Sequence, residues 1–116
     1  MFPNSRSRQT PRNDRPRTPK PRPKHPVVYV LTCRDGSLYT GWTIDLPGRL
    51  AAHRRGDGSR YVRSRLPFTL RAWWKVKDRS AALRDEARFK ALSRARKLAA
   101  LEAGQVFGRR VRNAPA

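Results

Sequence analysis

The apolar and polar positions of residues 27–42, VVYVLTCRDGSLYTGW, predict two short strands joined by an Asp-Gly turn. Each strand carries one tyrosine, Tyr29 in the first and Tyr39 in the second. A two-residue loop would place these tyrosines on opposite faces of the hairpin. A three-residue loop, 34–36, with Gly36 left-handed in a G1 bulge, would place them on one face. The pattern leaves both loops open, and Asp-Gly slightly favours the shorter one.

A helix is predicted over residues 45–55, with Asp45 as its N-cap and Gly56 closing its C-terminal end. One arc of about 100° on this helix collects four side chains: Leu46, Arg49, Leu50 and His53. Arg49 and His53 are four residues apart, so they are neighbours on the helix surface. An arginine that snorkels past the core beside a hydrogen-bonded histidine explains this pair as well as a functional site does.

The second half of the chain predicts a third strand and a long helical segment. Residues 68–76 alternate strictly and predict a strand with one buried face, made of Phe68, Leu70, Ala72, Trp74 and Val76. Residues 80–103 predict a helix that ends at Gly104, and a break near Ser93 would divide it in two. Residues 59–65 fit either one helical turn or a loop.

The long helix carries a glutamate beside its expected apolar stripe. We expect this stripe to consist of Leu83, Ala87, Ala91 and Leu98. Glu86 flanks it, where a carboxylate commonly pairs with a nearby arginine. In a domain with few acidic residues, Glu86 is also a natural ligand for a hard divalent cation. Both interpretations remain open from the pattern alone.

The element order β-β-α-β-α predicts an α+β fold over residues 27–103, with a small three-stranded antiparallel sheet and flanking helices. A chain of 116 residues has room for one such domain. The single cysteine, Cys33, excludes an internal disulfide, and neither histidine lies at a zinc-ligand spacing from it.

The charge balance indicates a polyanionic partner. The chain has 28 Lys/Arg against 8 Asp/Glu, a net charge of +20, and such a surplus opposes compact folding while it attracts polyanions. Nucleic acid is the favoured partner and an anionic membrane surface is the alternative. No apolar run approaches the ~20 residues of a membrane span, and no signal-peptide core follows Met1. We therefore expect a soluble cytoplasmic protein that does not enter membranes, and a monomer is favoured.

The two ends of the chain differ in composition from the domain between them. Residues 1–26 hold seven of the ten prolines and eight Lys/Arg, which predicts a disordered arm with polyproline II character. This arm either attracts phosphate without sequence preference or is a passive solubilising tail; a transit peptide fits less well because the prolines would break its helix. Residues 104–116 are interpreted as a second short basic tail.

The hairpin resembles the two signature triplets of the GIY-YIG nuclease superfamily, with VVY at 27–29 in the first place and YTG at 39–41 in the second. The resemblance continues in order, since DLPGRLAAHRRG is similar to the family's helix with an arginine and a histidine, and DRSAALRDEARFKAL to its later helix with a glutamate. It covers residues 27–101 and is closest to the short stand-alone branch of the superfamily. The resemblance implies that Tyr29 and Tyr39 share one cleft, so it favours the three-residue loop.

What the resemblance implies for the hairpin residues follows position by position. Tyr29 matches the tyrosine that helps to deprotonate the attacking water. Tyr39 matches the tyrosine that positions this water and the scissile phosphate. Gly41 matches the glycine at which a side chain would crowd the cleft.

The helices supply the other implied catalytic residues. Arg49 matches the phosphate-binding arginine, His53 the residue that relays a proton, and Glu86 the ligand of one divalent ion, Mg²⁺ or Mn²⁺. A free tyrosine, with a pKa near 10, is a poor base at neutral pH. We expect the charges of the metal and of Arg49 to lower this pKa, and His53 to take up the proton.

The segment RRGDGSRYVRSR, 54–65, is expected to contact the nucleic-acid substrate. Its basic side chains could follow a phosphate backbone while its tyrosine stacks on a base; the residues are Arg54, Arg55, Arg60, Tyr61, Arg63 and Arg65. For any single arginine, solvation of a loop is an equally good explanation.

These observations predict a metal-dependent endonuclease that acts on DNA, with single-stranded or branched DNA favoured, in repair, recombination or DNA uptake. The alternative is a non-catalytic nucleic-acid-binding module associated with RNA or the ribosome. The chain departs from the family pattern at Val27 and Val28, which replace Gly and Ile. It also lacks the downstream asparagine of many larger relatives, because the only asparagine after the hairpin is Asn113.

Overall fold

The computed structural model describes residues 25–113. The predicted arm therefore lies outside the described residues except for its last two positions. Within the described part, no helix is long and apolar enough to cross a membrane.

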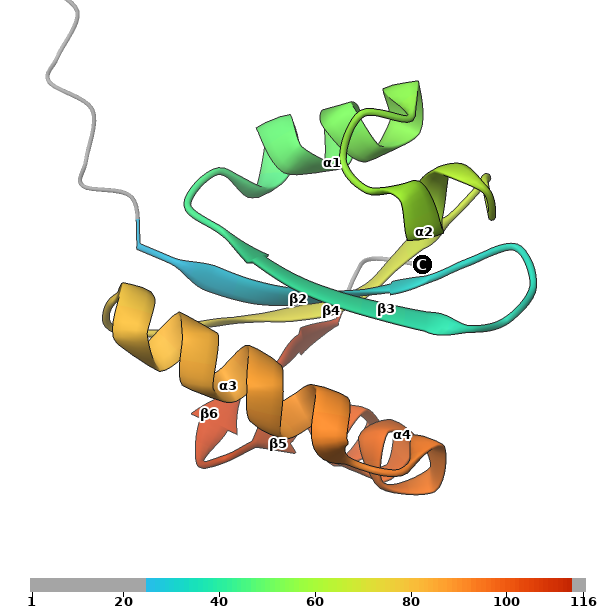
Figure 1. The fold of residues 1–116 in the computed structure, drawn as a ribbon. Coiled ribbons are helices and arrows are strands. Elements are labelled where there is room, and N and C mark those ends of the chain that lie inside the picture. The colour runs from blue at the N-terminus through green and yellow to red at the C-terminus, as the bar shows by residue number, and fades with distance from the viewer. Residues whose placement is uncertain (1–24, 114–116) are drawn as a thin grey trace, which may run out of the picture.

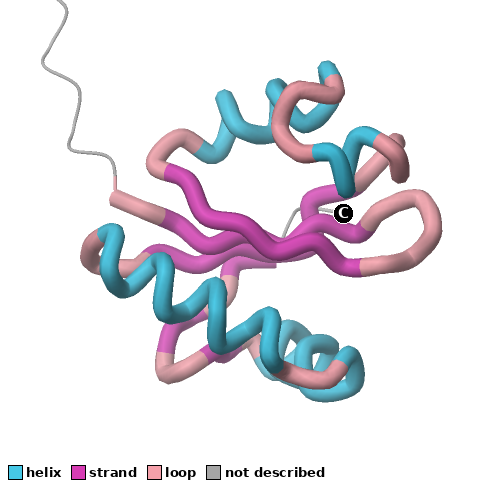
Figure 2. Tube along the Cα trace, viewed as in Figure 1, coloured by secondary structure: helices cyan, strands magenta, loops and turns pink. Residues whose placement is uncertain are grey.

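The fold has three layers, with a sheet between two groups of helices (Figures 1 and 2). The sheet is antiparallel with strand order β3-β2-β4-β7, where the strands are β2 (Val27–Thr32), β3 (Leu38–Thr43), β4 (Thr69–Lys75) and β7 (Arg112–Asn113). One face is covered by α1 (Leu46–Arg55) and α2 (Arg60–Arg63). The other face is covered by α3 (Arg79–Ala91), α4 (Arg94–Ala103) and the small hairpin β5 (Gln105–Val106) and β6 (Arg109–Arg110). The predicted α+β fold is confirmed; the main sheet has one strand more than expected, and the β5–β6 hairpin was not predicted.

The β2–β3 hairpin has the three-residue loop. The Cys33 N–H donates to Ser37 O at 2.9 Å and the Gly36 N–H donates to Cys33 O at 2.8 Å. Gly36 has a φ of +84°, which a residue without a side chain adopts at little cost. The longer loop shifts the pairing so that Tyr39 lies opposite Leu31, and Tyr29 and Tyr39 consequently point to the same face.

The predicted helix ends are also confirmed. Asp45 caps α1 by accepting a hydrogen bond from the Gly48 N–H at 3.3 Å, and Gly56 ends the helix with a left-handed conformation. The long helical segment breaks between α3 and α4, where Ser93 caps α4 by accepting from the Arg96 N–H. Residues 60–63 form one helical turn, α2.

Strand β4 does not bury just one face, so the prediction of a strand with one buried face is wrong. Val30 pairs with Ala72 but Leu31 pairs with Leu70, which leaves Arg71 as the extra residue of a bulge. A bulge inverts the side-chain alternation. Phe68 and Leu70 therefore pack with Tyr29 and Leu31 under α1, whereas Ala72, Trp74 and Val76 pack with Val28 and Val30 on the α3 side.

Helix α3 buries a different face from the predicted stripe. Leu83 is 53% exposed, and Ala87 and Ala91 are exposed as well. The buried residues are Ala81, Ala82, Asp85 and Phe89. The prediction is wrong because it excluded Asp85, a carboxylate that is buried with two hydrogen-bond donors.

Asp85 joins three parts of the fold. Its Oδ2 atom accepts from Trp74 Nε1 in β4 at 2.9 Å and from Arg109 Nε in β6 at 2.9 Å. The C-terminal residues therefore do not form a simple basic tail: Val106 and Val111 are buried in the core, and β7 pairs with β4. The folded domain extends to at least Asn113.

Replacement of Asp85 by alanine is expected to destabilise the protein by about 3 kcal/mol, because the Trp74 N–H and the Arg109 guanidinium would both lose their acceptor. The value lies at the lower end for buried ion pairs since Arg109 is partly exposed and can turn toward water. The midpoint of urea unfolding measures this loss. An unchanged midpoint would show that the C-terminal hairpin is not held by this contact.

Candidate active site

Two tyrosines and a histidine meet on the sheet face beneath α1. The Tyr29 hydroxyl lies 2.8 Å from His53 Nε2, and both side chains are fully buried. The Tyr39 ring centroid lies 6.4 Å from that of Tyr29 and 5.4 Å from that of His53. The hairpin and α1 thus bring together three residues that are up to 24 positions apart in the sequence.

Gly41 allows this arrangement because it lies opposite Tyr29 in the hairpin. A Cβ atom at Gly41 would come within 2.6 Å of the Tyr29 hydroxyl oxygen and 2.8 Å of the ring carbon that bears it. Real Cβ atoms do not approach that closely. A side chain at this position would therefore push the Tyr29 hydroxyl away from His53.

The Tyr29 side chain keeps its proton at neutral pH in the protein alone. Burial raises the pKa of Tyr29 above its usual value near 10, and the neighbouring Tyr39 raises it further. Arg49 lowers this pKa through its charge and a side-chain hydrogen bond, while Glu86 raises it. The expectation that Arg49 lowers the pKa is correct in direction, but burial outweighs it.

His53 is suited to accept that proton. Burial lowers the pKa of His53 below its usual value, and the charge of Arg49 lowers it further. The imidazole is then neutral at pH 7, and in the tautomer with its hydrogen on Nδ1 it accepts from the Tyr29 hydroxyl through Nε2. Among the described residues, Nδ1 is buried without a hydrogen-bond partner.

Gly58 lies directly against His53, a contact that the sequence interpretation missed. A Cβ atom at Gly58 would overlap with Nδ1 of the ring. The backbone between α1 and α2 thus closes over the histidine on the side away from Tyr29. The second glycine of RRGDGS was the available signal, but a glycine in a short loop commonly marks only a turn.

We expect Gly58→Ala to displace the His53 ring and to separate Nε2 from the Tyr29 hydroxyl. The reason is steric, because the backbone of this loop would have to move or the imidazole would have to rotate. A ¹⁵N NMR measurement of the imidazole pKa detects the change: the displaced ring gains water, so the pKa of His53 rises toward its usual value. Gly104→Ala, at the C-terminal end of α4 on the other face of the sheet, has open space around it but a positive φ, so it strains the backbone away from His53 and controls for a general loss of stability. An unchanged His53 pKa in Gly58→Ala would contradict the positioning role of Gly58.

An aromatic and cationic stack borders the site. The Tyr61 ring, 37% exposed, stacks on Tyr39 with centroids 5.9 Å apart. The Arg65 guanidinium carbon lies 3.7 Å from the centre of the Tyr61 ring. Arg65 is held by Asp35, whose Oδ2 accepts from Nε at 3.0 Å. The hairpin loop and α2 are consequently joined beside Tyr39.

The remaining basic residues predicted to contact substrate have different surroundings. Arg54 lies over the Phe68 ring at 5.5 Å. Arg55 is exposed and pairs with Asp57 at 3.2 Å. Arg60 and Arg63 are exposed on α2. Asn113, which the sequence left without a role, accepts from Arg71 at the β7 edge of the sheet, the edge opposite to β3.

Glu86 is an acidic side chain whose charge reaches Tyr29. Its side chain is 20% exposed and pairs with Lys90 Nζ at 3.3 Å, and its charge raises the pKa of Tyr29. Within residues 25–113 no cluster of three or more His, Cys, Asp or Glu gathers. A divalent ion at Glu86 would therefore take other ligands from phosphate and water, which is the usual way in which Mg²⁺ is held at phosphoryl-transfer sites. Glu86 would be the one carboxylate of such a site, and it comes from α3, on the other face of the sheet from α1.

Residues 25–99 match the GIY-YIG catalytic domain. A UPF0213 protein of Halobacterium salinarum is 50% identical over 70 residues, which cover 60% of this chain and 91% of that protein. A UPF0213 protein of Xanthomonas campestris is 47% identical over 83 residues, which cover 72% of this chain and 79% of that protein.

A solved structure is also similar. It is the solution NMR structure of a UPF0213 protein from Bacillus halodurans, which is 40% identical with a TM-score of 0.47 and covers 68% of this chain and 84% of its own. The domain match extends over the hairpin, α1, α2, β4 and α3, the elements that carry Tyr29, Tyr39, Arg49, His53 and Glu86. It implies a nuclease-type domain that binds nucleic acid. The chain belongs to the GIY-YIG family.

Proposed function

We propose that the protein is a metal-dependent endonuclease that hydrolyses phosphodiester bonds in DNA, preferentially in single-stranded or branched regions. The observation that carries this proposal is the buried hydrogen bond between the Tyr29 hydroxyl and His53 Nε2, with Tyr39 and Arg49 beside it. A buried proton donor and a neutral acceptor in direct contact form a ready path for one proton.

The proton of the attacking water follows this path. The water oxygen attacks phosphorus while one of its protons passes to the Tyr29 oxygen, and the Tyr29 proton passes to His53 Nε2. Tyr29 thereby remains a neutral phenol throughout, in keeping with its raised pKa. His53 becomes an imidazolium ion and later returns its proton to solvent or to the leaving oxygen.

Arg49 and Tyr39 orient the phosphate. The Arg49 guanidinium suits a phosphate because its planar N–H groups donate to two oxygens at once. A bound phosphate would also offset the charge by which Arg49 holds the pKa of His53 down, so substrate binding makes the histidine a better base. At Glu86 the protein would hold one Mg²⁺ or Mn²⁺ ion, which supplies positive charge to the leaving oxygen when bound.

The surroundings of the site favour a single strand. Tyr61 and Arg65 present a stacked aromatic ring and guanidinium next to Tyr39, the combination that holds unpaired bases without sequence preference. Because Arg65 covers the Tyr61 ring, a base would stack on the guanidinium plane or replace it. Arg54, Arg55, Arg60 and Arg63 add positive charge for the backbone on either side.

A cleavage assay tests the proposal. End-labelled single-stranded, forked and duplex DNA of one sequence is incubated with Mg²⁺, with Mn²⁺ or with EDTA. We expect cleavage of the first two substrates only with a divalent ion. DNA binding without cleavage of any substrate would overturn the proposal and favour a non-catalytic nucleic-acid-binding module; the same assay with RNA then identifies its partner.

A further inference from the structure

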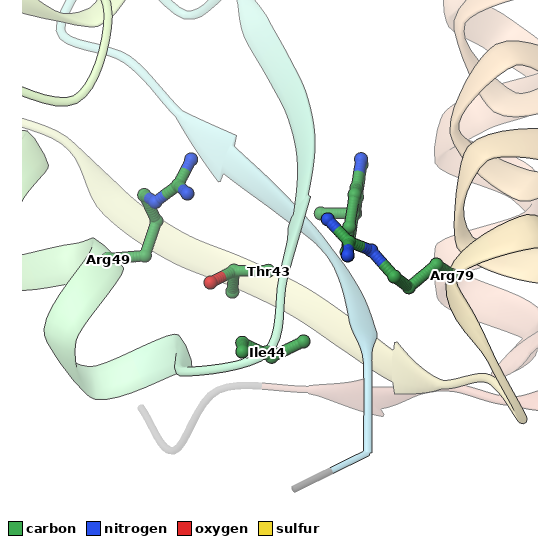
Figure 3. A pocket seen from close by; sticks show the side chains of 5 residues that line it. Thr43, Ile44, Arg49 and Arg79 are labelled. Atoms are coloured by element: carbon green, nitrogen blue, oxygen red, sulfur yellow. The ribbon is translucent and has the colours of Figure 1, made fainter.

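A pocket of about 420 Å³ lies at the free edge of β3, beside the candidate active site. Its lining residues are Trp42, Thr43, Ile44, Arg49 and Arg79. Figure 3 shows Arg49 on one side, Arg79 on the other, and Thr43 and Ile44 between them. The pocket thus shares Arg49 with the site, although Arg79 comes from a helix on the opposite face of the sheet.

Arg79 is held over an aromatic ring. Its guanidinium carbon lies 5.5 Å from the centre of the Trp42 ring, within the range of a cation–π contact. Trp42 itself packs against the core on the α3 side, so it is a firm support for the arginine. A guanidinium fixed in this way loses less conformational freedom when it binds a ligand than a free surface arginine does.

Ile44 gives the same pocket an exposed apolar surface. It is 54% exposed, the highest value among the three large hydrophobic side chains that are exposed in the described residues. An apolar surface between two arginines matches the chemistry of a nucleotide, which carries an apolar sugar and base edge next to its phosphate. An acidic peptide could offer carboxylates to the two arginines. It would not explain why the pocket shares Arg49 with the proposed phosphate site, whereas a nucleotide next to the bound phosphate does.

We propose that this pocket binds the nucleotide next to the cleaved bond, with its phosphate on Arg79 and its sugar or base edge against Ile44. This assignment rests on the proposed nuclease function, since it takes the phosphate on Arg49 as the scissile one. Trp42 is a positioning residue that holds Arg79. The volume of about 420 Å³ is enough for one nucleotide unit, and we take the strand to be single, as in the proposed function.

The test compares two arginines of α3 in the full-length protein. Arg79→Gln removes the proposed phosphate contact, and Arg84→Gln removes the same charge from an exposed position where the side chain contacts Ser80. Affinity for a fluorescent single-stranded DNA of about 12 nucleotides is measured by fluorescence anisotropy in EDTA over a range of salt concentrations. We expect Arg79→Gln to weaken binding roughly tenfold and to reduce the salt slope by about 0.7, the value for one phosphate contact on a single strand. Arg84→Gln should change both much less.

A second variant and a second substrate separate the subsite from general charge. Ile44→Ser should weaken binding to the single strand without a change in the salt slope, because it removes an apolar contact only. Blunt duplex DNA should respond less to Arg79→Gln than the single strand does. Equal effects of Arg79→Gln and Arg84→Gln, or an equal loss on duplex, would overturn the subsite. Binding is measured without a divalent ion, so its outcome does not depend on cleavage. Absence of cleavage would refute the nuclease proposal, and the binding data would still test the subsite.

Discussion

We expect the Tyr29→Phe variant to lose DNA cleavage by roughly 10²–10⁴-fold, the usual contribution of a positioned proton-transfer group, while it stays folded. The buried hydroxyl is the atom that touches His53, and phenylalanine keeps the ring that fills the space opposite Gly41. Loss of the hydroxyl leaves His53 Nε2 without its partner, which costs about 1–3 kcal/mol of stability. Single-turnover cleavage and thermal melting measure the two effects separately.

A double mutant shows whether Tyr29 and His53 act together. His53→Gln alone should also reduce cleavage strongly. If one proton passes through both side chains, the double variant is no slower than the more damaged single variant, because residues that act as a unit are not additive. Losses that multiply would show that the two side chains act in separate steps, and the shared proton path would be wrong.

Glu86→Gln is expected to reduce cleavage on the order of 10²-fold or more, since several kcal/mol of charge stabilisation depend on the divalent ion. The amide keeps the shape of the side chain but lacks the negative charge that holds a metal. DNA affinity in EDTA should be unchanged or higher, because the site becomes more positive. Glu102→Gln, the matched change in the only other glutamate, lies exposed on α4 and should have no such effect.

Melting distinguishes this role from a structural one. The partner of Glu86 is Lys90, which is 55% exposed, and exposed ion pairs contribute less than about 1 kcal/mol. The melting temperature of Glu86→Gln should therefore stay close to that of the wild type. A large decrease in melting temperature with intact metal-dependent cleavage would make Glu86 a structural residue.

The features predicted correctly from the sequence are those with local causes. Asp45 begins α1 and Gly56 ends it through hydrogen bonds to residues three or four positions away. Such signals are present in a short window of sequence. The length of the hairpin loop did not follow from the sequence pattern, because Asp-Gly suits both a two-residue and a three-residue loop. The family resemblance, which requires Tyr29 and Tyr39 on one face, favoured the loop that the structure has.

The features predicted wrongly depend on distant contacts. The residues of β4 alternate without interruption, so nothing in that strand marks the bulge at Arg71, which arises from pairing with β2. The predicted stripe of α3 left Asp85 out because the donors that allow its burial, Trp74 and Arg109, lie 11 and 24 positions away. The contact of Gly58 with His53 likewise depends on the path of a loop, which residue type alone does not determine.

The ion pair of Asp85 and Arg109 has a practical consequence for anyone who wishes to attach this domain to another protein. Asp85 fixes the rotation of α3, and Glu86 is the next residue on that helix, so the hairpin that carries Arg109 helps to aim Glu86. That hairpin lies beyond the stretch that matches the family domain, residues 25–99. We expect a fusion joined after Ala103 to lose the Asp85–Arg109 ion pair and, with it, the orientation of the Glu86 carboxylate. A fusion joined after Asn113 would keep the ion pair and this orientation.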